Sequence, residues 1–183
     1  MRARIQTLAL LTILTVACGI PIDAEPEILT IEIEDPPDIV EPTPEDLASV
    51  SLYLVREDEL VLVTRNLPAP TDLSDVVESL LDGVTDPEAR ADLRTSIPAG
   101  TEVIGMEISG EVLTLDLDRE FTAVGGEQEI LAIAQIVLTA TSVEGVGMVA
   151  FEIEGVPTAV PVASGALSET AVSSDDYSDL ISS

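Results

Sequence analysis

The feature that most constrains the fold is a long, almost uncharged apolar segment that follows two consecutive glycines. After Gly125 and Gly126, residues 127–143 place their apolar side chains at helical spacing. One face would carry Ile130, Ile133, Ala134, Val137, Leu138 and Thr141, and Leu131 and Ile136 widen it. A helix this apolar is stable in water only when it is largely buried. The pattern therefore predicts a helix packed against a sheet.

Short apolar runs with strand character flank this helix on both sides. The expected strands cover residues 50–55, 60–67, 101–108, 112–117, 148–153 and 158–162. Ser109-Gly110 is a tight-turn signal between two of them. We also expect a shorter helix that is capped by Thr71 or Ser74 and ends at Gly83, and a helical turn over residues 86–93. The order ββαββαββ predicts a single α+β domain, with a mostly antiparallel sheet and two main helices packed on one face.

The N-terminus has the pattern of an export signal. Residues 1–4 carry two arginines, and residues 5–16 are uncharged and mostly apolar. A helix of that length would span about 18 Å at 1.5 Å per residue, which is short of the ~30 Å hydrocarbon core of a membrane. We therefore predict a signal peptide over residues 1–17 and not a membrane-spanning helix.

The single cysteine of the chain follows this segment. Cys18 stands in the order Thr15-Val16-Ala17-Cys18-Gly19, which resembles the bacterial lipobox although leucine is usual at the position of Thr15. In a lipobox the cysteine is lipidated and becomes the mature N-terminus, and a signal peptide without lipidation is the alternative. A lone cysteine in an exported chain favours lipidation, because it has no disulfide partner. We expect an extracytoplasmic protein anchored to the cell membrane by a lipidated Cys18.

Residues 18–47 are acidic and rich in proline. They contain six prolines and no basic residue. Because like charges repel and proline stiffens the chain, we predict an extended tether. Residues 28–33 alternate weakly, so a strand formed there is the alternative to a featureless stalk. The globular domain is predicted over residues 48–165, followed by an acidic, Ser-rich tail over 166–183.

Composition excludes several classes of function. The 183 residues include 35 acidic and 7 basic side chains, with no histidine, so the formal net charge is −28. All the basic residues are arginine, so the chain lacks a Ser-His or Cys-His pair, a Schiff-base lysine and a P-loop lysine. One cysteine without histidine cannot build the usual zinc sites. The negative charge opposes binding to nucleic acid, and we expect neither a nucleic-acid partner nor a cofactor.

Four polar residues are candidates for contacts with a partner or ligand. Gln135 lies within the apolar helix and is either a hydrogen-bonded core residue or a contact residue. Asp116, Asp118 and Glu120 are spaced two apart, as on one side of a strand. They could collect a divalent cation or form the polar face of a half-exposed strand, and the spacing of an EF-hand is absent. We predict no metal site and no catalytic residue.

Short motifs follow one another in a characteristic order between about residue 50 and residue 180. They are Leu52-Tyr53, Leu60 with Arg65, Leu80-Leu81-Asp82-Gly83, Ile97-Pro98-Ala99-Gly100-Thr101, Asp116-Leu117-Asp118-Arg119-Glu120-Phe121, Gln135-Ile136-Val137-Leu138-Thr139, Glu154-Gly155 and Asp176-Tyr177-Ser178-Asp179-Leu180. The ordered set resembles the GerMN domain, a sporulation and spore-germination module also found in actinobacterial lipoproteins. The resemblance implies a ring-building-like α/β module of envelope assemblies without established catalysis.

These observations predict a lipid-anchored, non-catalytic interaction module at the outer cell surface. The resemblance links it to sporulation, germination or the cell wall. Its partners would be the membrane, through the lipid, and an envelope protein, and a homo-oligomer is compatible with the sequence. Sheet edges and the helix face are candidate contact surfaces.

Two other classes of function remain as alternatives. The first is a hydrolase that uses two carboxylates on wall glycans. Two tyrosines, two phenylalanines and no tryptophan supply few aromatic platforms for sugars, which disfavours it. The second is a small solute-binding lipoprotein, although such proteins usually need two lobes and a longer chain.

Overall fold

The computed structural model describes residues 46–182. The predicted signal peptide, Cys18 and the tether up to residue 45 lie outside the described residues. The strands are β1 (Leu47–Arg56), β2 (Glu59–Pro68), β3 (Val103–Ser109), β4 (Val112–Leu117), β5 (Met148–Ile153), β6 (Val156–Pro157), β7 (Val160–Pro161) and β8 (Leu167–Ser168). The helices are α1 (Leu73–Leu81), α2 (Asp86–Arg90) and α3 (Glu127–Ala140), with 3-10 helices η2 (Arg119–Ala123) and η3 (Ser174–Leu180).

The predicted hairpin forms from β1 and β2, which pair antiparallel along their whole length. Glu57 and Asp58 make the two-residue turn with φ of 50° and 70°. Positive φ at both turn residues matches the right-handed twist of the two strands. On the inner face, Leu52 and Leu54 are fully buried. Local sequence is thus enough to define this unit.

The cap of α1 corrects a prediction. Neither Thr71 nor Ser74 caps the helix, because Asp72 takes that role and its carboxylate accepts from the backbone N–H groups of Ser74 and Asp75. The Asp75 carboxylate accepts in turn from the N–H of Asp72, which completes a capping box. Thr71 instead donates its hydroxyl to the carbonyl of Pro68.

The four-stranded sheet has the order β3-β4-β5-β6. All its pairs are antiparallel except β4 with β5, which run parallel because α3 connects them as a crossover. The turn between β3 and β4 lies at Gly110-Glu111, one residue later than predicted. The α+β class with mostly antiparallel pairing is confirmed, and within residues 46–182 the strands are divided among three sheets.

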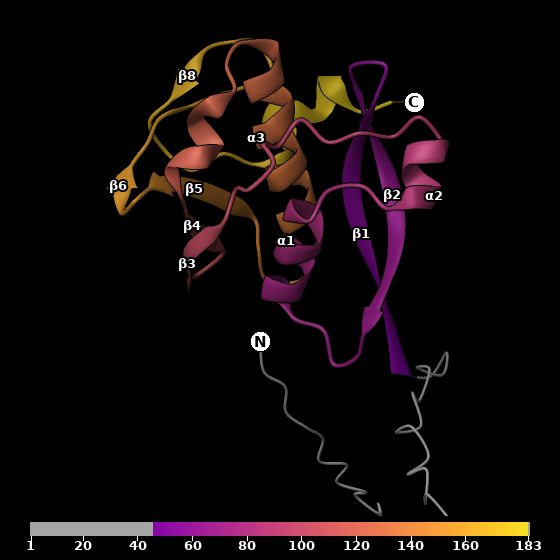
Figure 1. The fold of residues 1–183 in the computed structure, drawn as a ribbon. Helices are drawn as coiled ribbons and strands as arrows, with labels where there is room; N and C mark the ends of the chain where they lie inside the picture. The colour runs from indigo at the N-terminus through magenta and orange to yellow at the C-terminus, as the bar shows by residue number, and fades with distance from the viewer. Residues whose placement is uncertain (1–45, 183) are drawn as a thin grey trace, which may run out of the picture. The chain divides into compact units, whose positions relative to one another are not determined.

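Helix α3 is the centre of the core. It lies between the β1–β2 hairpin and the four-stranded sheet, and it contacts α1, β5 and β7 as well (Figure 1). Every residue from Leu131 to Ala140 is buried, and the helix ends at Ala140, three residues earlier than predicted. A helix that is apolar on nearly every side needs cover on more than one face, so it packs between layers and not on one face of a single sheet. None of the described helices is long and apolar enough to cross a membrane.

Residues 166–182, predicted as an acidic, Ser-rich tail, pack against the domain (Figure 1, yellow). Val172 forms a β-bridge with Val149, and Ile181 forms another with Leu60. Tyr177 is fully buried, and its hydroxyl donates to the carbonyl of Pro161 at 2.9 Å. Burial raises the pKa of this phenol. A few apolar side chains are therefore enough to hold an otherwise polar segment in place.

Candidate functional site

Gln135 is a structural residue of the core. Its side chain is fully buried, its Nε2 donates to the carbonyl of Tyr53 at 3.0 Å, and its Oε1 accepts from the N–H of Ser96 at 2.7 Å. One turn later, Thr139 Oγ1 accepts from the N–H of Tyr53 at 3.0 Å. Two side chains of α3 thus provide the hydrogen-bond partners for the N–H and C=O of Tyr53 at the edge of β1, where a neighbouring strand would otherwise provide them. Of the two roles considered for Gln135, the core role fits this geometry.

The three acidic candidates do not form one cluster. The expectation that they share one strand face is wrong, because β4 ends at Leu117 and the chain turns into η2, which contains Glu120. Asp116 Oδ1 accepts from the N–H of Gly155 at 2.9 Å, which fixes the β5–β6 turn. Asp118 Oδ1 is buried without a hydrogen-bond partner among the described residues. No group of three or more side chains that could hold a metal ion occurs in residues 46–182.

Arg65 organises a largely buried polar cluster. Its guanidinium forms two hydrogen bonds with the Glu88 carboxylate, at 2.9 and 2.6 Å. It also donates to the carbonyl of Gly83 at 2.6 Å and to the hydroxyl and carbonyl of Ser79. The side chains of Arg65 and Glu88 are only 11% and 9% exposed. The cluster therefore fixes β2 to the end of α1 and the start of α2, and it serves the fold.

The environment of Glu88 makes stability depend on pH. Burial alone would raise the pKa of this carboxyl, but hydrogen bonds from Arg65 and Thr85 outweigh burial and leave the pKa below its usual value. When the pKa of a carboxyl is lower in the folded state than in the unfolded state, the carboxyl contributes its full stabilisation at pH values above the unfolded-state pKa. That contribution is lost as the pH falls through the folded-state pKa.

We therefore expect Glu88→Gln to flatten the acid side of the stability curve. Because the amide does not titrate, the difference in free energy of unfolding between the two proteins should be largest near neutral pH and shrink in acid. Urea unfolding at a series of pH values measures it. A difference that is constant across the series would contradict the assignment.

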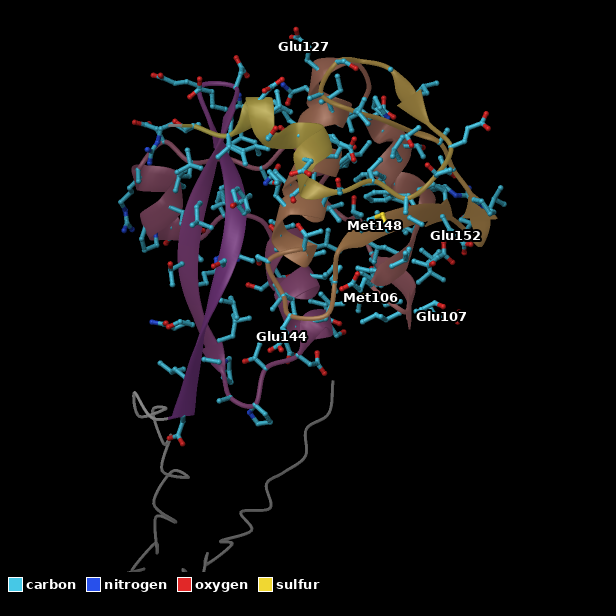
Figure 2. The ribbon with its side chains drawn as sticks, turned by 180° about the vertical axis from the view of Figure 1, so that it is seen from behind. Met106, Glu107, Glu127, Glu144, Met148 and Glu152 are labelled. Carbon is cyan, nitrogen blue, oxygen red and sulfur yellow. The ribbon has the colours of Figure 1, made fainter. Side chains whose placement is uncertain are left out.

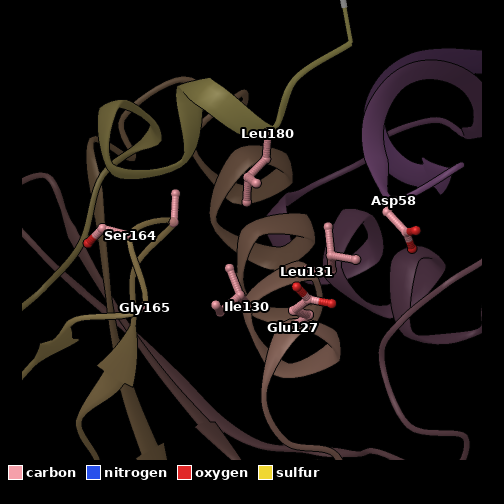
Figure 3. Close-up of a pocket in the computed structure, with 8 residues that line it drawn as sticks. Asp58, Glu127, Ile130, Leu131, Ser164, Gly165 and Leu180 are labelled. Atoms are coloured by element: carbon pink, nitrogen blue, oxygen red, sulfur yellow. The ribbon is translucent and has the colours of Figure 1, made fainter.

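An open pocket lies beside the start of α3 (Figure 3). Its volume of about 440 Å³ is within the usual range for small-ligand sites. It is lined by Asp58, Glu127, Ile130, Leu131, Ala163, Ser164, Gly165 and Leu180. Asp58 is already held by Arg94, with Oδ1 and Nη2 2.5 Å apart. The lining therefore offers mainly apolar contact and Glu127, the carboxylate that no described arginine holds.

The hairpin leaves one sheet edge open. The carbonyl of Leu60 accepts from the N–H of Ser182, so the peptide groups of Leu60 face away from β1. Because peptide groups alternate sides along a strand, those of Leu62 face the same way. The Leu62 side chain is 55% exposed. Beyond its contact with the C-terminal segment, β2 thus presents a free edge within the described residues.

Among residues 46–182, the four-stranded sheet leaves a second edge open, along β3. The carbonyl of Leu117 accepts from the N–H of Glu154, so the peptide groups of Leu117 face β5. By the same alternation, those of Asp116 and Thr114 face β3. The predicted contact face of α3 is buried in the core, so of the two contact surfaces predicted from the sequence only the sheet edges stay accessible among residues 46–182.

Comparison with known proteins places the chain in a family. The family described as "Germane: Sporulation and spore germination" matches residues 48–159. The tandem GerMN domains of the sporulation protein GerM from Bacillus subtilis have a similar fold, with a TM-score of 0.56 and 22% identity over 70% of this chain and 47% of that one. The chain thus spans about half the length of that tandem structure.

The first GerMN domain of the same protein, taken alone, gives a TM-score of 0.55 and 22% identity over 70% of this chain and 98% of that one. No curated protein sequence matches the chain. The structural likeness shows the fold, and the match over residues 48–159, more than half of the chain, shows the family. The chain belongs to the Germane family of sporulation and spore-germination domains.

Proposed function

We propose that this chain is a lipid-anchored, non-catalytic interaction module that assembles with another protein at the outer cell surface, in a process related to sporulation or germination. Family membership supports the biological setting. The lipobox-like order around Cys18 supports the anchor. The acidic, proline-rich residues that follow Cys18 would hold the domain away from the membrane.

The observation that carries the proposal is the structural use of the buried polar groups. Glu88, Gln135 and Thr139 are buried, and each is hydrogen-bonded to another part of the domain. Catalytic groups are instead expected to converge on a substrate cavity, with reactive atoms that are not engaged in structural hydrogen bonds. Among the described residues, the free edges of β2 and β3 and the pocket beside α3 remain accessible, which suits binding better than chemistry.

The anchor is tested by replacing the cysteine. We expect Cys18→Ser to move the protein from the membrane fraction to the soluble fraction, because two acyl chains supply the binding energy and serine is not acylated. Mass spectrometry of the mature N-terminus of the unchanged protein should show a lipidated Cys18. An unmodified Cys18, or membrane retention of the variant equal to that of the unchanged protein, would contradict the anchor.

Catalysis is tested separately with purified peptidoglycan. The pocket carboxylates Asp58 and Glu127 are the pair that a carboxylate-based hydrolase would use. We expect no release of soluble fragments above that of a heat-unfolded sample. Fragment release that Glu127→Gln abolishes would contradict the proposal and establish the hydrolase alternative.

A further inference from the structure

We propose that the free edge of β3 binds an extended segment of the partner protein, in which basic side chains alternate with apolar ones. This inference rests on the proposed function and adds to it the surface used and the chemistry of the partner. It is carried by three features of β3: its unpaired peptide groups, its exposed apolar side chains and the acidic surface beside it.

The unpaired peptide groups follow from the strand register. Thr114, whose peptide groups face β3, is paired with Glu107. The peptide groups of Glu107 therefore face β4, and those of its neighbours Met106 and Ile108 face outward. No hydrogen bond from residues 46–182 reaches these outward N–H and C=O groups. An incoming strand would find its hydrogen-bonding partners already in place, which is the geometry of strand addition.

The apolar side chains of β3 extend the core layer to this edge. Met106 and Ile108 are paired with the buried Leu115 and Leu113, so all four lie on the face that packs toward α3. Ile108 is nevertheless 51% exposed, and Ile104, where the register of β3 shifts by one residue, is 54% exposed. A strand added beside β3 would bury Met106 and Ile108 against its own alternate residues. That arrangement requires apolar residues at every second position of the partner.

The opposite face of the sheet carries negative charge next to the same edge. Glu107 lies on that face together with Asp116 and Glu152, which are paired with each other across β4 and β5. Figure 2 shows the labelled side chains of Glu107 and Glu152 at this sheet, and the label of Met106 next to that of Glu107. The remaining residues of the added strand would point to this face. Lysine or arginine there would be attracted, and a second copy of this chain, with its formal charge of −28, would be repelled.

The arginines of the domain cannot neutralise this surface. Arg119 is bound to Glu154 at the end of the sheet, with a nitrogen–oxygen distance of 2.9 Å. Arg65, Arg90 and Arg94 are each paired with an acid outside β3, β4 and β5. The fifth described arginine, Arg56, lies at the end of β1 and donates to the carbonyl of Ala91. The positive charge must therefore come from the partner.

The test uses full-length protein and a short fluorescein-labelled peptide in which lysine and valine alternate, and it measures binding by fluorescence anisotropy. In Met106→Pro, proline removes an outward N–H and places its ring on the free edge without touching the bonds to β4. Leu62→Pro makes the same change on the free edge of β2 and is the matched control. We expect Met106→Pro to weaken binding about tenfold or more and Leu62→Pro to leave it unchanged. Circular dichroism checks that both variants fold.

A second variant covers the case in which Met106→Pro fails to fold. Glu107→Lys reverses one charge and leaves the backbone alone, and we expect it to weaken binding severalfold, most at low salt. A peptide with glutamate in place of lysine should not bind. A peptide with the lysines and valines in separate blocks should bind more weakly, because it cannot place both kinds of side chain on their proper faces.

Several results would overturn the proposal. Equal binding by Met106→Pro, Leu62→Pro and the unchanged protein would show that the peptide does not bind the edge of β3 and binds the acidic residues before the domain instead. If sedimentation shows that the unchanged protein is a dimer and that Met106→Pro is a monomer, a second copy of the chain occupies the edge of β3 and the proposal is wrong. Failure of the peptide to bind, while crosslinking in membranes recovers a protein partner on another surface, would overturn this inference and leave the proposed function intact.

Discussion

Replacing Arg65 with methionine is expected to lower the free energy of unfolding by about 3–5 kcal/mol. The substitution keeps most of the apolar stem but removes the guanidinium that bonds Glu88, Ser79 and Gly83. It leaves the buried Glu88 carboxylate without its partner, and an unpaired buried charge is more costly than the pair itself. Urea unfolding followed by circular dichroism at neutral pH measures the change.

Two further variants separate this effect from a general loss of charge. Arg119→Met removes an exposed ion pair with Glu154 and should leave the free energy of unfolding almost unchanged. Adding Glu88→Gln to Arg65→Met should recover part of the loss, because the amide carries no charge to leave unpaired. If Arg65→Met is no more destabilising than Arg119→Met, the buried cluster does not hold the fold together.

Replacing Gln135 with leucine is expected to cost several kcal/mol in the free energy of unfolding. Leucine fills a similar volume but leaves the buried N–H of Ser96 and the half-buried carbonyl of Tyr53 without partners. Each orphaned backbone group costs about 1–3 kcal/mol. The same unfolding measurement tests the prediction.

The matched control is Gln128→Leu, on the exposed first turn of the same helix. Its exposed side chain accepts one hydrogen bond, from the hydroxyl of Ser96 at 3.1 Å, so only one group loses its partner and the change should cost less than Gln135→Leu. If Gln135→Leu is as stable as the unchanged protein, the geometry described for α3 and β1 is incorrect. Gln135 would then be free for a partner, as the alternative sequence interpretation held.

The elements that sequence predicts well are those defined by local pattern. The hairpin follows from two alternating runs around a short polar turn, and α3 follows from apolar spacing after a Gly-Gly break. The cap of α1 does not follow from the sequence, because Thr71, Asp72 and Ser74 are all good capping residues within four positions. Which of them caps is decided by the path of the chain that enters the helix.

Features that depend on distant contacts could not be read from the sequence. The parallel pairing of β4 with β5 depends on where α3 returns the chain. The role of Arg65 depends on Glu88, which lies in another element and is not indicated by the sequence around Arg65. Spacing alone groups Asp116, Asp118 and Glu120, but spacing does not show that the chain leaves the strand after Leu117.

Chemical crosslinking of the full-length protein in its native membranes, followed by affinity purification and mass spectrometry, tests whether the domain works by binding another protein. We expect to recover one envelope protein in constant proportion, with crosslinks to β3 or its neighbouring strands. Cys18→Ser should abolish this recovery, because it removes the protein from the membrane. Recovery of the protein alone, as an unassociated monomer, would contradict the claim that it works by binding another protein.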